Sequence, residues 1–228
     1  MKLTFLGHSA FLCSQNSISV LFDPFLKENP VRVGLSSDVK AEYILVSHGH
    51  RDHLGDTVEL ALKHNSKVVS IFEISNYLAS KGLNNLVPMN IGGEVQTEFG
   101  YVKMVMAIHS SSILDGESVL NGGFPAGFVI NFFGKTIYFA GDTALFGDMK
   151  LIGDLYDIDI ALLPVGGHFT MDTKDALHAI DMLRPKLVIP MHFNTWPVIS
   201  TGVDSFLKDS ESKGVKGVCL DVDESIEI

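Results

Sequence analysis

The sequence has few cysteines, few charged residues and no long apolar run. Its two cysteines, Cys13 and Cys219, are too few for a disulfide framework in 228 residues. Reduced thiols are typical of the cytoplasm, where we expect the protein. Gly7, His8 and Ser9 interrupt the apolar N-terminal stretch, so it does not resemble a signal peptide. No segment has the roughly 18 uninterrupted apolar residues of a membrane span, so none is expected.

The composition is that of a chain with a substantial core and an acidic surface. Hydrophobic residues make up 46% of the sequence, and the formal net charge is -10. Such a surface repels nucleic-acid phosphates, so a nucleic-acid partner is not expected. Small anionic substrates stay admissible, because a bound divalent cation reverses the local field. The sequence does not indicate an oligomeric state, and a homo-oligomer is compatible with it.

Apolar strands and amphipathic helices mix along the whole chain. Strands are predicted at 3–6, 10–13, 18–22, 41–46, 67–71, 102–107, 128–133, 136–140, 160–165 and 187–191, and helices at 56–64, 74–81 and 172–183. Glycine and lysine at 134–135 indicate a hairpin turn, whereas 115–123 is predicted to be a mobile loop. Hairpins combined with strand–helix–strand units predict a layered α/β sandwich in one domain, residues 1–228.

One six-residue motif carries most of the chemical information. It reads His48-Gly49-His50-Arg51-Asp52-His53 and follows the predicted strand at 41–46. Imidazole nitrogens and carboxylate oxygens are ligands of zinc and similar divalent ions. In a loop just past a strand, His48 and His50 can point at one ion, while Asp52 and His53 turn toward a second. The motif therefore predicts half of a two-metal site.

Three further candidates stand where a predicted strand enters a loop, namely His109, Asp142 and His192. Loops at strand ends commonly present functional residues on a rigid scaffold. Taken alone, each histidine is more typical of a structural residue, and the Gly-Asp pair at 141–142 is more typical of a turn. These three residues are stronger ligand candidates together with the motif. Zinc needs four ligands, of which a catalytic site leaves one position for water, so the four groups of the motif do not complete two sites.

Together these residues resemble the metallo-β-lactamase superfamily, in the same order and over essentially the full chain. The sequence looks closest to an uncharacterised branch of small metal-dependent hydrolases in bacteria and archaea. A sugar-phosphate lactonase family is a more distant likeness. The stretches that match the branch are 6–10 (LGHSA), 22–24 (FDP), 107–112 (AIHSSS), 125–128 (PAGF), 166–171 (GGHFTM) and 189–192 (IPMH).

The resemblance implies a four-layer αββα sandwich with mixed sheets and two metal ions at one edge. In that family pattern, the first ion would be held by His48, His50 and His109, the second by Asp52, His53 and His192, and both by Asp142 as a bridge. The ligands offer only nitrogen and oxygen, which suits zinc and also admits manganese, iron, nickel and cobalt.

Such a site predicts a hydrolase. Two ions about 4 Å apart can share a water and lower its pKa toward neutrality, giving a hydroxide that attacks a carbonyl or phosphoryl centre. The substrate class is an ester, lactone, amide or phosphoester of a small molecule. Asp52 could also orient the attacking hydroxide, and His168 is the candidate that protonates the leaving group. Metal-bound histidines usually donate to a carboxylate or carbonyl, for which Asp23 and Asp56 are candidates, and His8 could also face the metals.

Three other functions stay open at the level of sequence. The same fold can hold iron and act as an oxidoreductase, or serve as an RNA-processing nuclease. A metal-binding sensor without catalysis is the third. An antibiotic-degrading β-lactamase is not indicated, because function belongs to the site and not to the fold.

Overall fold

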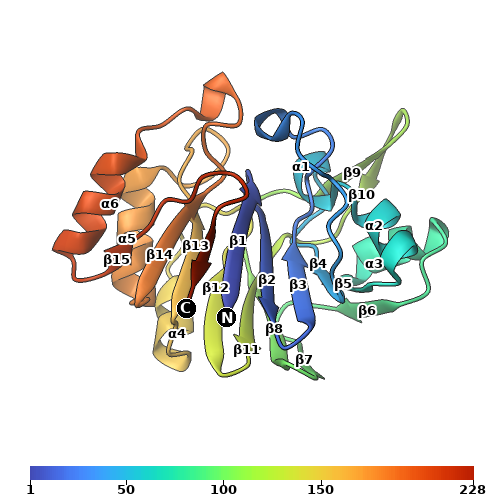
Figure 1. The fold of residues 1–228 in the computed structure, drawn as a ribbon, viewed down its shortest axis with the longest axis horizontal. Coiled ribbons are helices and arrows are strands. Elements are labelled where there is room, and N and C mark those ends of the chain that lie inside the picture. The colour runs from blue at the N-terminus through green and yellow to red at the C-terminus, as the bar shows by residue number, and fades with distance from the viewer.

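Two seven-stranded sheets form the centre of the computed structural model, which describes residues 1–228 (Figure 1). The first sheet contains β1 (Lys2–Gly7), β2 (Ala10–Gln15), β3 (Ile18–Phe22), β4 (Tyr43–Leu45), β5 (Lys67–Ile71), β6 (Leu86–Met89) and β16 (Ser225–Glu227), in the spatial order β16-β1-β2-β3-β4-β5-β6. The strands from β16 to β3 pair antiparallel, and those from β3 to β6 pair parallel. The sheet is therefore mixed, as predicted.

The second sheet repeats this pattern. It contains β7 (Glu94–Thr97), β8 (Gly100–Met106), β11 (Ala126–Phe132), β12 (Lys135–Phe139), β13 (Ile160–Pro164), β14 (Leu187–Met191) and β15 (Lys216–Gly217), in the spatial order β15-β14-β13-β12-β11-β8-β7. The strands from β7 to β12 pair antiparallel, and those from β12 to β15 pair parallel.

Helices lie on both outer sides of the pair of sheets (Figure 1). Those on the side of the first sheet are α1 (Arg51–Leu54), α2 (Thr57–His64) and α3 (Phe72–Ser80), and those on the other side are α4 (Met149–Leu155), α5 (Thr173–Leu183) and α6 (Val203–Ser212). Short 3-10 turns occur at Pro30–Arg32 and Pro197–Ile199. No helix here combines the length and apolarity needed to cross a membrane. These four layers confirm the αββα sandwich.

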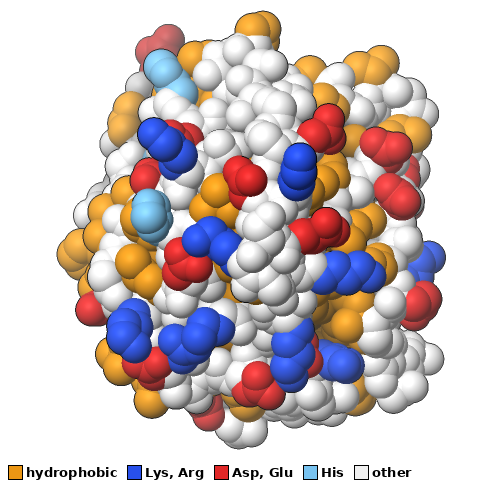
Figure 2. All heavy atoms as spheres, turned by 90° about the vertical axis from the view of Figure 1, so that its left-hand side faces the viewer, with side chains coloured by type: hydrophobic (Ala, Val, Ile, Leu, Met, Phe, Trp, Pro, Cys, Tyr) orange, Lys and Arg blue, Asp and Glu red, His pale blue; other side chains and the backbone are white.

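Acidic and basic side chains are interspersed on the side formed by α4, α5 and α6, as Figure 2 shows. Several of them pair across elements. Arg184 contacts Asp154 at 2.6 Å, and Lys213 contacts Asp181 at 2.7 Å. This helical face therefore mixes charges of both signs.

The sheets meet over one continuous core of 60 buried residues. Aromatic rings connect the two sheets: Phe22 of β3 stacks on Phe139 of β12 with 4.9 Å between centroids. Strands β13 and β14 are buried along their whole length, which explains their unbroken apolar sequences. Burial on both faces sets the positions of these strands, and with them the loops that follow.

All ten predicted strands and all three predicted helices are present, with ends shifted by up to two residues. The predicted mobile loop at 115–123 is wrong. That stretch contributes to a two-stranded hairpin of β9 (Ser112–Asp115) and β10 (Ser118–Asn121). Asp115 pairs with Ser118, so the two-residue turn is Gly116-Glu117, and Gly116 has the positive φ (60°) that the first position of such turns favours.

Strand direction brings the candidate residues to one edge. Since β1 and β3 each pair antiparallel with β2, they run the same way, and β4 is parallel to β3. By the same reasoning β8, β12 and β14 share one direction. The residues that follow these six strands are His8, Asp23, His48, His109, Asp142 and His192. Topology alone thus gathers them at the carboxyl ends of the strands.

Candidate metal centre

The motif loop after β4 divides into two parts. His48 is fully buried, and its Nδ1 lies 2.9 Å from the hydroxyl of Ser47. Its Nε2 is 3.0 Å from Nδ1 of His50. The chain then enters α1 at Arg51, so Asp52 and His53 project from a helical turn. This change of backbone conformation lets six consecutive residues serve two neighbouring positions.

The first group of ligand atoms combines both sheets. His48, His50 and His109 each offer a nitrogen within 4.8 Å of the other two. His109 comes from the loop after β8, whereas the other two follow β4. The hydroxyl of Ser110 lies 3.3 Å from Nε2 of His50. Three convergent imidazoles can hold one divalent ion and leave a position for water.

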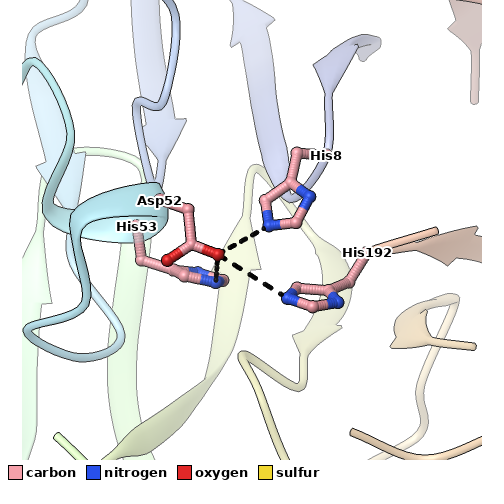
Figure 3. A group of neighbouring side chains, drawn as sticks. All are labelled: His8, Asp52, His53 and His192. Atoms are coloured by element: carbon pink, nitrogen blue, oxygen red, sulfur yellow. Dashed lines mark hydrogen bonds and ion pairs between the residues drawn. The ribbon is translucent and has the colours of Figure 1, made fainter. Parts of the chain in front are cut away.

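The second group surrounds the Asp52 carboxylate (Figure 3). Its Oδ2 lies 3.0 Å from Nε2 of His8, 3.7 Å from Nε2 of His53 and 3.8 Å from Nε2 of His192. His53 and His192 are fully or almost fully buried. The structure thus places His8, which the sequence offered only as a residue near the metals, within hydrogen-bond distance of a predicted ligand.

Asp142 lies between the two groups. Its Oδ2 is 3.0 Å from Nε2 of His192 and 3.3 Å from Nε2 of His53 in the second group. The same oxygen is 3.6 Å from Nε2 of His109 and 4.0 Å from Nε2 of His48 in the first. One carboxylate oxygen therefore reaches nitrogens of both groups, as a bridging ligand must.

A buried carboxylate orients the motif from behind. Asp23 accepts hydrogen bonds from Nδ1 of His53 (2.7 Å) and from the amide (2.8 Å) and hydroxyl (2.5 Å) of Ser47. These bonds leave Nε2 of His53 facing the centre. Asp56 does not contact the motif histidines. Its carboxylate accepts hydrogen bonds from the backbone amides of Leu26 and Lys27, both at 2.9 Å. Of the two predicted supporting carboxylates, the structure brings only Asp23 to a candidate ligand.

Burial opposes charge throughout the centre, and neighbouring charges either reinforce that effect or override it. Burial, followed by the charge of His53, holds the pKa of His48 well below its ordinary value. Burial alone would raise the pKa of Asp142, but His192 and His53 hold it well below the usual range. Burial likewise disfavours a charged His53, yet Asp142, Asp52 and Asp23 raise its pKa well above the ordinary value. In the metal-free protein these directions favour an ionised Asp142 carboxylate and a protonated His53 at neutral pH.

The residues fit divalent cations. Nε2 of His53 and Oδ1 of Asp142 are buried and have no hydrogen-bond partner in the protein, and such atoms are costly to bury. Nε2 of His48 and Nδ1 of His50 face each other at 3.0 Å, as two nitrogens of one coordination shell do. Cations between these atoms would satisfy them all.

A cavity of ≈ 380 Å³ opens over the centre. Its lining consists of His50, Asp52, His109, Ser110, Asp142, Phe169 and His192. His168 lies outside this lining, exposed on the loop after β13, with its ring against Phe169 at a centroid distance of 4.5 Å. The structure therefore brings the seven predicted ligands together, whereas His168 is not among the residues that line the cavity.

Comparison with known proteins agrees with this geometry. Residues 2–192 match the beta-lactamase superfamily domain. A "UPF0173 metal-dependent hydrolase" of Desulforamulus reducens is 51% identical over 212 residues, covering 92% of each chain. A protein of the same name from Methanosarcina mazei is 44% identical over 229 residues, covering 100% of this chain and 99% of the relative.

Solved structures share the fold. Igni18, described as a metallo hydrolase from the archaeon Ignicoccus hospitalis, superposes with a TM-score of 0.89 at 36% identity, covering 100% of this chain and 98% of that one. An isothiocyanate hydrolase from Delia radicum gut bacteria superposes with a TM-score of 0.75 at 19% identity, covering 100% of this chain and 99% of the other, which shows a common fold alone. The chain therefore belongs to the beta-lactamase superfamily and, within it, to the UPF0173 family of metal-dependent hydrolases.

Proposed function

We propose that this protein hydrolyses an ester, lactone, amide or phosphoester bond of a small molecule, using two divalent metal ions. The residues that would hold the ions are His48, His50, Asp52, His53, His109, Asp142 and His192. The observation that carries the proposal is the position of Asp142, whose Oδ2 lies within 4.0 Å of nitrogens from both ligand groups. A single-metal site would not need a carboxylate oxygen that reaches both ligand groups.

The side chains divide the work of the reaction. Two bound divalent ions would supply hydroxide at neutral pH and polarise the oxygen of the electrophile. Asp52, which lines the cavity, would accept a hydrogen bond from the attacking water and orient it. Burial alone would raise the pKa of Asp52, but His53 and His8 hold it below its usual range, so its carboxylate is an acceptor at neutral pH. Asp23 would keep His53 in the tautomer that faces the ion.

His168 would protonate the leaving group. Its ring packs against that of Phe169, which lines the cavity, and it does not belong to the ligand set. His168→Asn should lower kcat by about 10²-fold or more with little change in metal content, because general acids contribute about that much. His178→Asn, on the exposed face of α5, is the matched control. An unchanged kcat in His168→Asn would remove this residue from the mechanism.

The decisive experiment joins metal analysis to a substrate screen. Protein purified without added metal is analysed for bound ions, stripped with a chelator, and reloaded separately with zinc, manganese, iron, nickel or cobalt. Each form is assayed on esters, lactones, amides and phosphodiesters. We expect two ions per chain, with zinc as the first candidate, and turnover only in reloaded protein. Turnover in fully stripped protein would contradict the proposal.

The same experiment separates the other functions. Stoichiometric iron together with oxygen consumption and no hydrolysis would indicate an oxidoreductase. RNA binding that weakens steeply with salt would indicate a nuclease. Two tightly bound ions without turnover on any class would indicate a metal sensor.

We also propose a cytoplasmic location. Cys13 is buried and Cys219 is half-buried, and both are free thiols in the structure. Unpaired cysteines suit a reducing compartment. Fractionation of the native host, followed by antibody detection, tests this: recovery of the protein outside the cytoplasmic fraction would contradict it.

A further inference from the structure

His8 stands out among the residues that the predicted ligand set does not use. It follows β1 and has a positive φ of 60°, which is rare for residues other than glycine. Its imidazole is fully buried. The ring packs against Trp196 at 5.0 Å, Phe25 at 5.8 Å and His192 at 4.1 Å between centroids. A buried polar ring in an unusual backbone conformation needs specific partners.

Both ring nitrogens have such partners. Nδ1 lies 2.8 Å from the hydroxyl of Thr195, and Nε2 lies 3.0 Å from Oδ2 of Asp52. Figure 3 shows His8 and His192 on one side of Asp52 with His53 on the other. The oxygen that His8 contacts is the one directed at His53 and His192. His8 therefore connects a loop of the second sheet to a candidate ligand from the first.

The direction of these hydrogen bonds follows from the groups involved. A carboxylate oxygen only accepts, so Nε2 of His8 must carry the proton that Asp52 receives. In the neutral ring Nδ1 is then an acceptor, and Thr195 can donate to it. The alternative acceptor for Thr195, the carbonyl of Phe193, is 3.5 Å away, at the limit of a hydrogen bond. Thr195 thus donates a hydrogen bond to His8, and His8 donates one to Asp52.

We infer that His8 is a positioning residue, which holds the carboxylate of Asp52 in place for the ion that Asp52 would share with His53 and His192. This inference rests on the proposed two-metal function. The competing role is a direct ligand through Nε2. That role is disfavoured because Asp52, His53, His192 and Asp142 already offer four donors, the usual number for zinc.

The test measures zinc binding directly, with separate dissociation constants for the two ions. His8→Phe keeps an aromatic ring between Phe25 and Trp196 but has no donor. It should lower the affinity for the second ion about 10- to 100-fold, the usual cost of losing such a support. The affinity for the first ion should stay within about threefold of the wild-type value. His8→Gln places an amide N–H near the position of Nε2 and should restore the affinity to within about threefold of wild type. His64→Phe is the control, since His64 pairs with Asp38 (2.8 Å) and lies outside both ligand groups.

Further variants keep the inference testable if His8→Phe does not fold. Thr195→Val removes the hydroxyl and should lower the affinity for the second ion about 3- to 10-fold, whereas Thr195→Ser keeps the hydroxyl and should not lower it. The visible spectrum of the cobalt form should be the same in wild type and His8→Gln, because the ligand set is unchanged.

The outcomes are distinct. Wild-type affinity in His8→Phe, or in Thr195→Val, overturns the inference. His8→Gln as weak as His8→Phe, with an altered cobalt spectrum, also overturns it and makes His8 a ligand. Wild-type protein that takes up no second ion contradicts the proposed function instead.

Discussion

The backbone amide of His192 donates a hydrogen bond to the carbonyl of His8 (2.8 Å), which joins the end of β14 in one sheet to the end of β1 in the other. Both residues have positive φ, 54° and 60°. Such conformations persist only where the surrounding structure holds them, and they cluster at functional sites. A backbone hydrogen bond thus links the two sheets beside the candidate centre, so the ligand positions are largely set by the fold.

Asp142→Ala should remove the bridge between the two groups. We expect bound zinc to fall from two ions to one or fewer, and any hydrolytic rate to fall by more than about 100-fold, since losing a mere support of a ligand already costs about 10- to 100-fold. Elemental analysis and steady-state kinetics on the same preparation check both. Retention of two ions with normal turnover would exclude Asp142 as a ligand.

Asp23→Asn should weaken the binding of the ion near His53 without removing one of its ligands. Asp23 holds His53 from behind at 2.7 Å, and such supports contribute about 10- to 100-fold in metal affinity. Asp56→Ala is the matched control: it removes two backbone hydrogen bonds and should cost about 1–3 kcal/mol of unfolding free energy while leaving zinc affinity unchanged. Zinc titration and chemical denaturation separate the two effects. Equal zinc affinity in Asp23→Asn and wild type would contradict the expectation.

Metal uptake should release protons and weaken as the pH falls. Burial lowers the pKa of His53, but the carboxylates of Asp142, Asp52 and Asp23 raise it well above the ordinary value. The imidazole of His53 in the metal-free protein therefore carries an extra proton at neutral pH. An ion must displace that proton, so the apparent affinity should rise about tenfold per pH unit below the raised pKa. Calorimetry in buffers of different ionisation enthalpy measures the proton release. A binding enthalpy independent of buffer would show that none occurs.

Gly49→Ala should disturb the motif loop. A Cβ at this position would lie 2.7 Å from Cγ1 of Ile113 and 3.0 Å from the carbonyl oxygen of Ser112, so β9 or the loop must move. We expect weaker zinc binding, chiefly for the ion held by His48 and His50. Gly147→Ala, where a Cβ meets nothing within 4 Å, is the control. If both variants bind zinc like the wild type, the contact between hairpin and loop is not important for the site.

Removing the ions should lower the melting temperature. Ions that bind only the folded state stabilise it by about 2.7 kcal/mol at a concentration of about 100 times the dissociation constant. Scanning calorimetry with and without chelator measures the shift. The Asp142→Ala variant should shift much less, and an equal shift in both would point to ions bound elsewhere.

Much of the centre could be predicted from the sequence because its main motif is local. His48 to His53 lie within six consecutive residues, and the strands that precede Asp142 and His192 have largely apolar sequences. Those strands are buried over most or all of their length, so composition alone identifies them.

The features that were missed depend on distant partners. The contact of His8 with Asp52 joins the segments that follow β1 and β4, whose proximity appears only once these strands lie in one sheet. Helix α6 has only three apolar residues, Val203, Phe206 and Leu207, so its apolar face is short although it has helical spacing. Strand β16 has three residues and exists through pairing with β1. No local pattern marks a strand as short as β16.

The ligand groups draw on both sheets, and this has a consequence for the order of events in the cell. Residue 192 leaves the ribosome long after residue 48, so no nascent chain can complete the centre before residue 192 has emerged. Metal insertion into the complete centre must then follow the synthesis of residue 192. With nitrogen and oxygen donors that accept several first-row ions, the metal found in the protein depends on which ions are available at that moment.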